Sequence, residues 1–198
     1  MWEDRFAAEE GFLFGRRPAA FLKENRWLTQ GASSALCVAD GEGRNGVWLA
    51  GQGLDVTSFD LSPTAVRRSQ ALAGEAGVKV SAHVSAWDDW DWSRAFDAVF
   101  GIFIQFMGPE PRKQKFATLS QAVRPGGRLV LHGYTPEQIA LGTGGPPFVE
   151  NMYTEEILTE AFPNWQIERL ASYERDVQEG RGHSGRSALI DFVARRPR

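Results

Sequence analysis

Short apolar runs alternate with amphipathic stretches over the first two thirds of the chain. The runs that predict strands are 35–39, 55–60, 78–84, 96–103 and the last part of 123–132. The stretches between them predict helices at 45–52, 63–73 and 109–122, the second of them with Ser62 as its N-cap. Because strand and helix alternate, the strands are expected to be parallel and joined by right-handed crossovers.

The carboxyl-terminal part of the chain departs from this alternation. After the glycine- and proline-rich loop 142–147 and a helix capped by Thr154, two apolar runs follow at 165–170 and 187–194. No helix is predicted between these two runs. Two strands joined without a crossover helix are antiparallel, so the sheet is expected to end in an antiparallel hairpin.

Length and composition indicate one globular domain, 1–198, in which residues 1–30 form an amino-terminal flap and a short helix at 19–28. Hydrophobic residues make up 42% of the chain and charged residues 24%, which is ordinary for a globular protein and argues against disorder. The sequence shows no internal repeat and no linker to a second domain. The flap is rich in aromatic side chains, and Trp2, Arg5 and Phe14 are candidates for a lid, as are the glycines of 143–147.

The charge pattern and the metal-ligating residues limit the partners. A net charge of −3 gives no basic face for DNA or RNA, so no nucleic-acid partner is expected. Neither a membrane-spanning run nor a secretory signal is recognisable, which predicts a cytoplasmic protein with no membrane partner. The single cysteine, Cys37, lies in an apolar run and is expected to be a buried structural thiol. The three histidines have no zinc-site spacing, so no metal is expected.

A glycine pattern follows the first predicted strand directly. Gly41-x-Gly43-x-x-Gly46 lies between a strand and a helix, where backbone N–H groups can approach a nucleotide. Asp60 ends the second strand, where a carboxylate can accept hydrogen bonds from the ribose hydroxyls of an adenosine. The same features also suit a plain strand-to-helix turn and an acid at a helix N-terminus. The spacing alone therefore leaves NAD, S-adenosylmethionine (SAM) and a purely structural turn open.

Four segments together carry a family resemblance. They are the loop Ala39-Asp40-Gly41-Glu42-Gly43-Arg44-Asn45, the strand end Asp60-Leu61-Ser62, the strand Phe96-Asp97-Ala98-Val99-Phe100 and the turn Arg124-Pro125-Gly126-Gly127-Arg128-Leu129-Val130. Through them the chain resembles the class I SAM-dependent methyltransferases over almost its entire length. The resemblance implies a Rossmann-like α/β three-layer sandwich with a mostly parallel seven-stranded sheet and an antiparallel last strand. It also implies SAM as the cofactor.

The resemblance also implies which residues hold SAM. Those expected at the methionine and ribose end, the adenine ring and the sulfonium are, in chain order, Ala39, Asp40, Gly41, Gly43, Asn45, Asp60, Leu61, Ala86, Trp87, Ile102 and Phe103. The chain departs from the family pattern at Cys37, in place of the usual first acid, and at Ala39, in place of the first glycine. We expect Asp40 to supply a carboxylate for the amino group of SAM from a shifted position.

The two ends of the chain are similar to the tellurite-resistance group and its relatives, through Trp2-Glu3-Asp4-Arg5-Phe6, Phe14-Gly15-Arg16-Arg17-Pro18 and Gly182-His183-Ser184-Gly185-Arg186-Ser187-Ala188. This implies methyl transfer to a small molecule, such as a thiol or a chalcogen oxyanion like tellurite. Arg181, His183 and Arg186 are expected to form a basic cluster on the acceptor side, between the last two strands. For an oxygen or nitrogen acceptor, His183 or Tyr134 is the candidate base.

Several alternatives remain open from the sequence. A nicotinamide-dependent oxidoreductase would share the glycine loop and Asp60. A non-catalytic SAM-binding module would keep the loop and lack an acceptor site. The sequence also leaves open the acceptor, the need for a general base, and whether the protein is a monomer or a weak dimer.

Overall fold

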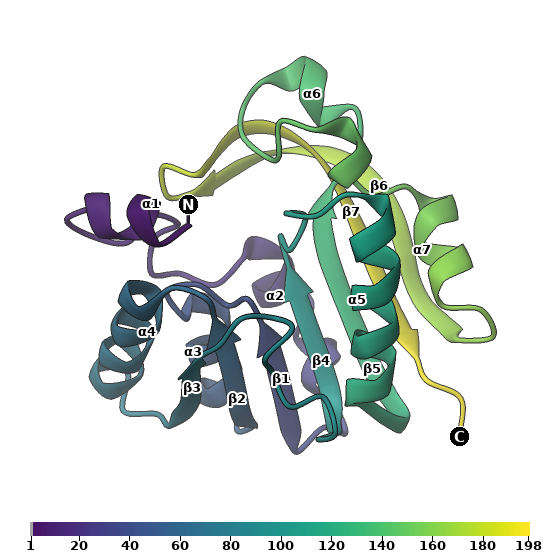
Figure 1. Cartoon of the computed structure of the whole chain (residues 1–198), viewed down its shortest axis with the longest axis horizontal. Helices are drawn as coiled ribbons and strands as arrows, with labels where there is room; N and C mark the ends of the chain where they lie inside the picture. The colour runs from purple at the N-terminus through teal and green to yellow at the C-terminus, as the bar shows by residue number, and fades with distance from the viewer. Residues whose placement is uncertain (1) are drawn as a thin grey trace.

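The computed structural model describes residues 2–198 and contains a seven-stranded sheet with the strand order β3-β2-β1-β4-β5-β7-β6 (Figure 1). The strands are β1 (Ser34–Val38), β2 (Asp55–Asp60), β3 (Val80–Val84), β4 (Phe96–Ile102), β5 (Val123–Tyr134), β6 (Gln166–Glu179) and β7 (His183–Arg195). Strands β1 to β5 pair in parallel, whereas β7 is antiparallel to both β5 and β6. The predicted fold class, with its antiparallel last strand, is confirmed.

Helices cover both faces of the sheet. They are α1 (Trp2–Ala8), α2 (Ala20–Glu24), α3 (Arg44–Gly51), α4 (Pro63–Glu75), α5 (Pro109–Ala122), α6 (Gln138–Leu141) and α7 (Glu155–Ala161), with 3-10 turns η1 (Arg26–Thr29) and η2 (Val149–Asn151). Two of the helices begin where side-chain caps were predicted. Ser62 Oγ accepts a hydrogen bond from Ala65 N at 3.0 Å, and Thr154 Oγ1 accepts one from Ile157 N at 3.2 Å.

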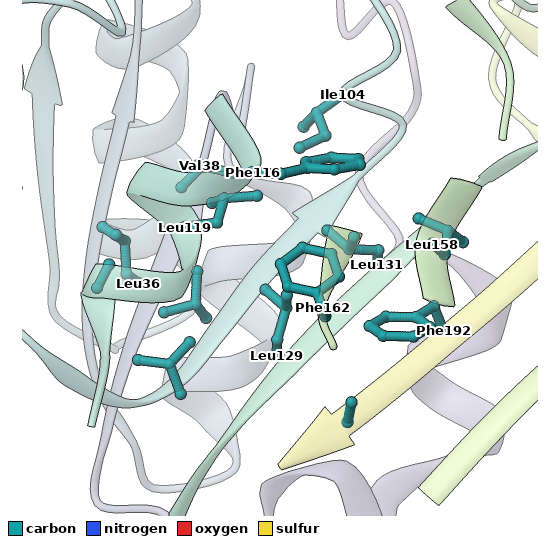
Figure 2. Close-up of a cluster of buried hydrophobic side chains, with 14 of the residues drawn as sticks. Leu36, Val38, Ile104, Phe116, Leu119, Leu129, Leu131, Leu158, Phe162 and Phe192 are labelled. Carbon is teal, nitrogen blue, oxygen red and sulfur yellow. The ribbon is translucent and has the colours of Figure 1, made fainter. Parts of the chain in front are cut away.

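Two apolar clusters hold the layers together, one on each face of the sheet. Figure 2 shows the first, in which Phe116 and Leu119 of α5 and Phe162 after α7 pack on the sheet. The second lies under α2 and α3 on the opposite face. Alternate residues of β5 supply the two clusters, Leu129 to the first and Val130 to the second, because successive side chains of a strand point to opposite faces.

Several elements differ from the sequence predictions. The helix predicted at 19–28 is interrupted at Asn25 and forms α2 and η1, and α1 and α6 were not predicted. Strands β6 and β7 extend well beyond 165–170 and 187–194. The added part of β6 is mostly polar, with Val177 as its buried residue, so its sequence lacks the regular apolar positions that mark a half-buried strand. The extended hairpin curves over toward α1 (Figure 1).

The features that bear on metals and membranes are simple. Cys37 is a free, buried cysteine in β1, and burial raises the pKa of its thiol well above the ordinary value. Among residues 2–198, no group of three or more histidine, cysteine or acidic side chains is arranged to hold a metal ion. No helix within the same range is both long and apolar enough to cross a membrane.

Candidate functional site

The loop that connects β1 to α3 has a backbone conformation that depends on its glycines. Gly43, the N-cap of α3, has φ of 82°, and a Cβ added there would lie 2.0 Å from Ser69 Oγ and 2.9 Å from Ser69 Cα. A Cβ on Gly46 would lie 2.5 Å from Asp40 Oδ2. Gly43 therefore lets α4 pack against the loop, and Gly46 lets the Asp40 carboxylate reach the start of α3. Ala39 has φ of 48°, a conformation that side chains rarely adopt.

Two carboxylates lie at this loop, the half-buried Asp40 within it and the buried Asp60 at the end of β2. Asp60 Oδ2 accepts a hydrogen bond from Gly41 N and Oδ1 accepts one from Ser62 N, each at 2.9 Å. Asp40 Oδ2 accepts from Gly46 N at 3.1 Å. Burial, more than the nearby Asp60 charge, raises the pKa of Asp40 to about 7, and burial also raises the pKa of Asp60. The loop thus presents one acid that titrates near neutrality and one that is fixed by two backbone donors.

The other residues predicted to hold the cofactor fall into two groups, one at an edge of the sheet and one engaged inside the protein. Leu61 is 55% exposed beside Asp60, Ala86 is half-buried after β3, and Ile102 and Phe103 lie at the carboxyl end of β4. These positions share the edge where the carboxyl ends of β1, β2 and β4 meet, which is where ligands bind in open α/β sheets.

Trp87 and Asn45 are engaged inside the protein instead. The Trp87 ring is 8% exposed within the core cluster, and its Nε1 donates to Thr118 Oγ1 at 3.1 Å. Asn45 Oδ1 accepts from Ala19 N at 2.9 Å and fixes the chain where it enters α2. Their side chains therefore support the site's surroundings.

His183 and Tyr134 form a buried pair on β7 and β5. The Tyr134 hydroxyl lies 2.6 Å from His183 Nδ1, and the rings of Phe14 and Phe103 lie 4.6 and 4.2 Å from the imidazole. Burial, with a contribution from the Arg44 charge, lowers the pKa of His183 to about 3, so this imidazole is neutral at physiological pH. Burial raises the pKa of Tyr134, so its hydroxyl keeps its proton.

The predicted basic cluster of Arg181, His183 and Arg186 is not assembled, and this prediction was wrong. The Arg181 side chain is 85% exposed and lies 3.6 Å from Glu9, while Arg186 pairs with Glu174 at 3.1 Å. His183 and Arg186 belong to the same strand and are three residues apart, so their side chains project to opposite faces. Arg181 precedes the strand in the exposed hairpin turn.

A second buried histidine, His132, is paired with Asp191, and this pair was not predicted from the sequence. The Phe103 ring contacts both this imidazole and that of His183. His132 Nδ1 is 2.7 Å from Asp191 Oδ1, and the two residues are 2% and 0% exposed. Arg169 Nε donates to Asp191 Oδ2 at 2.7 Å and the Tyr173 hydroxyl donates to Oδ1 at 3.1 Å. Although burial alone would raise the pKa of Asp191, the bonds from His132 and Arg169 hold it below its ordinary value. The available signal was a lone acid inside the apolar run Leu189-Ile190-Asp191-Phe192-Val193.

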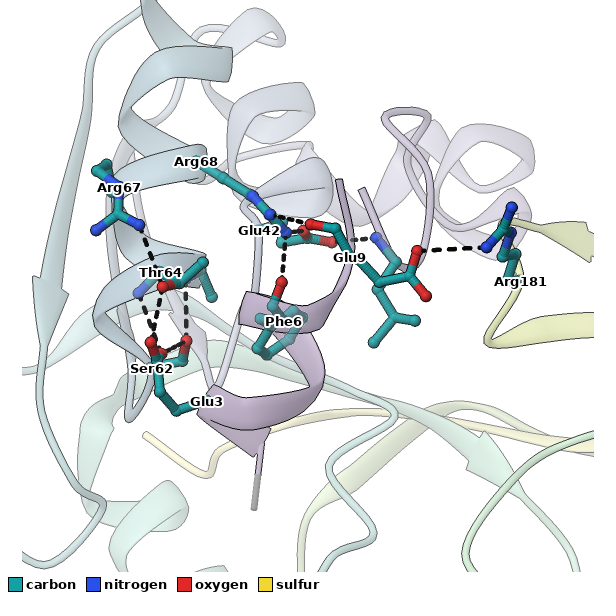
Figure 3. A network of polar contacts seen from close by, with 11 residues as sticks. Glu3, Phe6, Glu9, Glu42, Ser62, Thr64, Arg67, Arg68 and Arg181 are labelled. Atoms are coloured by element: carbon teal, nitrogen blue, oxygen red, sulfur yellow. Dashed lines mark hydrogen bonds and ion pairs between the residues drawn. The ribbon is translucent and has the colours of Figure 1, made fainter. Parts of the chain in front are cut away.

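The amino-terminal segment is tied to the glycine loop and to α4, as Figure 3 shows. Glu3 accepts from the Ser62 hydroxyl and from Thr64 Oγ1, the latter at 2.7 Å. Arg68 of α4 donates to the carbonyl oxygen of Phe6 at 2.9 Å and to the buried Glu42 at 2.7 Å. These bonds hold α1 over the loop.

The three predicted lid residues lie on this segment. Arg5 stacks 4.5 Å above the Trp2 ring, and Phe14 packs on His183. Trp2 itself is 36% exposed. The β6–β7 hairpin approaches from the other side, where Arg181 N donates to the Leu13 carbonyl oxygen at 3.1 Å.

Comparison with known sequences gives one domain match and partial relatives. Residues 35–127 match a family described as "Methyltransferase domain". The chain is 35% identical over 105 residues to "Uncharacterized protein Rv1403c" of Mycobacterium tuberculosis, an alignment that covers 52% of this chain and 37% of that protein. The chain thus spans just over a third of the length of the curated relatives that it matches.

Comparison with solved structures gives closer matches in shape than in sequence. A structure from work on the conversion of a disulfide bond into a thioacetal group during echinomycin biosynthesis has a TM-score of 0.82 at 19% identity, over 99% of this chain and 90% of that one. N-methyltransferase NodS from Bradyrhizobium japonicum, in complex with S-adenosylhomocysteine (SAH), has a TM-score of 0.73 at 13% identity, over 100% of this chain and 97% of that one. TehB from Haemophilus influenzae has a TM-score of 0.72 at 15% identity, over 98% of this chain and 67% of that one. At these identities the likeness establishes the fold.

Proposed function

We propose that this chain, which has the fold of the SAM-dependent methyltransferases and a methyltransferase domain match over residues 35–127, transfers a methyl group from SAM to a small-molecule acceptor. The observation that carries the proposal is the pairing of the β1–α3 glycine loop with Asp60 at the carboxyl end of the neighbouring β2. In Rossmann-like folds an acid at this strand end binds the ribose of an adenosine, while the glycine loop lets the backbone approach the ligand closely.

The residues at the loop fit the chemistry of SAM. Each Asp60 oxygen already accepts one backbone hydrogen bond and retains a lone pair for a ribose hydroxyl. The half-buried Asp40 nearby is a partner for the α-ammonium group, and the exposed Leu61 offers an apolar surface for the adenine ring. When bound, SAM supplies a methyl group that is already activated by its sulfonium. The chain's task is then to align the acceptor and to exclude water, which the covering α1 and the β6–β7 hairpin support.

The acceptor classes that we propose are a thiol or a chalcogen oxyanion such as tellurite, together with small amines. The resemblance of the chain ends to the tellurite-resistance group supports the oxyanion. The disulfide named with the echinomycin-related structure supports a sulfur compound, and the name of N-methyltransferase NodS supports an amine. Arg181 and Arg186, expected to attract an anion, are exposed and paired with Glu9 and Glu174. This pairing favours an acceptor that arrives neutral over an oxyanion.

Turnover separates an enzyme from a non-catalytic SAM-binding module, which is the second candidate function. The purified chain is incubated with SAM and, in turn, 2-mercaptoethanol, selenite, tellurite and methylamine, and SAH release is measured by mass spectrometry. We expect release above the acceptor-free rate with at least one of them. Cofactor binding with no release across the panel would favour the module.

The affinity for SAH is expected to rise with pH through the titration of Asp40. The pKa of Asp40 is about 7 in the folded protein, against an ordinary value of 3.8, so part of the population is protonated below pH 7. Binding a cationic ammonium group favours the ionised form and releases the proton, so binding is weakest at low pH. We expect SAH to bind up to about tenfold more weakly at pH 6 than at pH 8, since one pKa unit corresponds to one tenfold step.

Titration calorimetry at pH 6, 7 and 8, in buffers of different ionisation enthalpy, measures both the affinity and the released proton. Asp40→Asn is the matched variant, because it keeps the side-chain shape and cannot ionise. Its affinity should be lower and independent of pH. A pH dependence that survives in Asp40→Asn would assign the titration to another group.

A further inference from the structure

The buried pair of His132 and Asp191 lies next to the predicted position of the transferred methyl group. His132 is paired with Ile102 of β4 on one side and with Asp191 of β7 on the other. Phe103 N, immediately after β4, donates to the His132 carbonyl oxygen at 2.8 Å. The imidazole is thus one strand away from the β4 end, where Ile102 and Phe103 are expected near the sulfonium.

The surroundings of the imidazole fix its orientation. The Phe21 ring stacks on it at 4.6 Å with an interplanar angle of 2°, and the Phe103 ring meets it edge-on at 4.8 Å. Nδ1 faces Asp191, and Arg169 and Tyr173 hold that carboxylate in place. An ionised carboxylate only accepts hydrogen bonds, so Nδ1 carries a proton. In the neutral form of the ring, the free lone pair is therefore on Nε2.

Nε2 is on the other edge of the ring from β7 and makes no hydrogen bond within residues 2–198. In this described part of the chain, Ser69 Oγ is the only buried side-chain nitrogen or oxygen without a partner. Nε2 has no partner either and is not among these buried atoms, so part of its surface is accessible to water, although the residue as a whole is only 2% exposed. The neighbouring His183 differs, because its Nδ1 is occupied by Tyr134 and its pKa of about 3 makes it a poor proton acceptor.

We propose that His132 is the general base of the methyl transfer and that Asp191 positions it, for acceptors that carry a proton on sulfur, nitrogen or oxygen. This inference rests on the proposed function. A lone pair of the acceptor atom forms the bond to the methyl carbon, the carbon–sulfur bond breaks, and its electron pair stays on the sulfur of SAH. The acceptor's proton passes to Nε2 of His132, and Asp191 stabilises the imidazolium that results. In a chalcogen oxyanion the lone pair on selenium or tellurium takes the methyl group, and because that atom carries no proton, this acceptor does not need the base.

The first test needs no acceptor. Long-range ¹H–¹⁵N NMR of the wild-type chain, with and without SAH, reports which imidazole nitrogen is protonated. We expect His132 to be neutral, with its proton on Nδ1, and its Nε2 resonance to shift when SAH binds. A proton on Nε2, a doubly protonated ring or an Nε2 resonance that ignores bound SAH would overturn the inference. A failure of SAH to bind at all would instead refute the proposed function.

The second test measures turnover with 2-mercaptoethanol and methylamine. His132→Asn retains an amide donor for Asp191 and removes Nε2, so we expect kcat to fall by about 10²- to 10⁴-fold, as when a general base is lost. SAH affinity should stay within about threefold, and Asp191→Asn should lower kcat without changing KM. His83→Asn, at an exposed histidine of β3, is the control. An unchanged kcat in His132→Asn would contradict the assignment. So would a loss of kcat with selenite or tellurite as large as the loss with 2-mercaptoethanol and methylamine. If His132→Asn fails to fold, the NMR result on the wild-type chain decides whether the assignment stands.

Discussion

Replacing Gly43 with alanine is expected to lower the free energy of unfolding by about 2–5 kcal/mol. An L-residue in the left-handed conformation costs about 1–2 kcal/mol, and Gly43 has φ of 82°. The new Cβ would also lie 2.9 Å from the Cα of Ser69, which is backbone of α4 and cannot rotate away. Such overpacking typically costs about 1–3 kcal/mol. Urea denaturation followed by circular dichroism measures the change.

Gly51→Ala is the matched control, because Gly51 belongs to the same helix α3 and a Cβ there would meet no atom within 4 Å. Alanine at this helical position is expected to leave stability unchanged or to raise it by about 0.5–1 kcal/mol. Similar losses in both variants would mean that the steric account of the loop is wrong. A loss confined to Gly43→Ala would confirm that α4 packs directly on the glycine loop.

Asp60→Ala is expected to have the second large effect, on cofactor binding. Each charge-assisted hydrogen bond from a ribose hydroxyl contributes about 1.5–3 kcal/mol, so SAH should bind roughly 10- to 150-fold more weakly. The same carboxylate accepts from Gly41 N and Ser62 N, so the variant should also melt at a lower temperature. Calorimetry with SAH, at a temperature where the variant remains folded, separates binding from stability.

Asp55→Ala provides the comparison for this variant. Asp55 is at the opposite end of the same strand β2, and its side chain is exposed. SAH affinity should therefore equal that of the wild-type chain. A folded Asp60→Ala variant that binds SAH as tightly as Asp55→Ala would refute the ribose role of Asp60.

The parts of the fold that the sequence predicted well depend on local signals. The bounds of β2 (Asp55–Asp60) and α5 (Pro109–Ala122) agree with the predictions to the residue. In β2 the apolar residues Val56 and Phe59 lie between two aspartates, and α5 begins at a proline, which fits the first turn of a helix, and carries Phe116 and Leu119 on one face. The glycine loop was predictable for the same reason, since its residues are adjacent in the chain.

The parts that the sequence did not predict depend on contacts between distant segments. The His132–Asp191 pair follows from the register of β5 against β7, which no local pattern encodes. The burial of His183 depends on Phe14, from the other end of the chain, and on Phe103. The basic cluster failed because the strand begins at His183 and places Arg186 on the opposite face. Adjacent charges in the sequence were therefore a poor guide to this part of the site.

Titration calorimetry of the whole chain against SAH and against NAD tests the central claim most directly. The two ligands share the adenosine that the glycine loop and Asp60 suit, and they differ in what lies beyond the ribose. The account predicts saturable one-to-one binding of SAH, lost or strongly weakened in Asp60→Ala, and no saturable heat with NAD. Saturable binding of NAD with no response to SAH would contradict it.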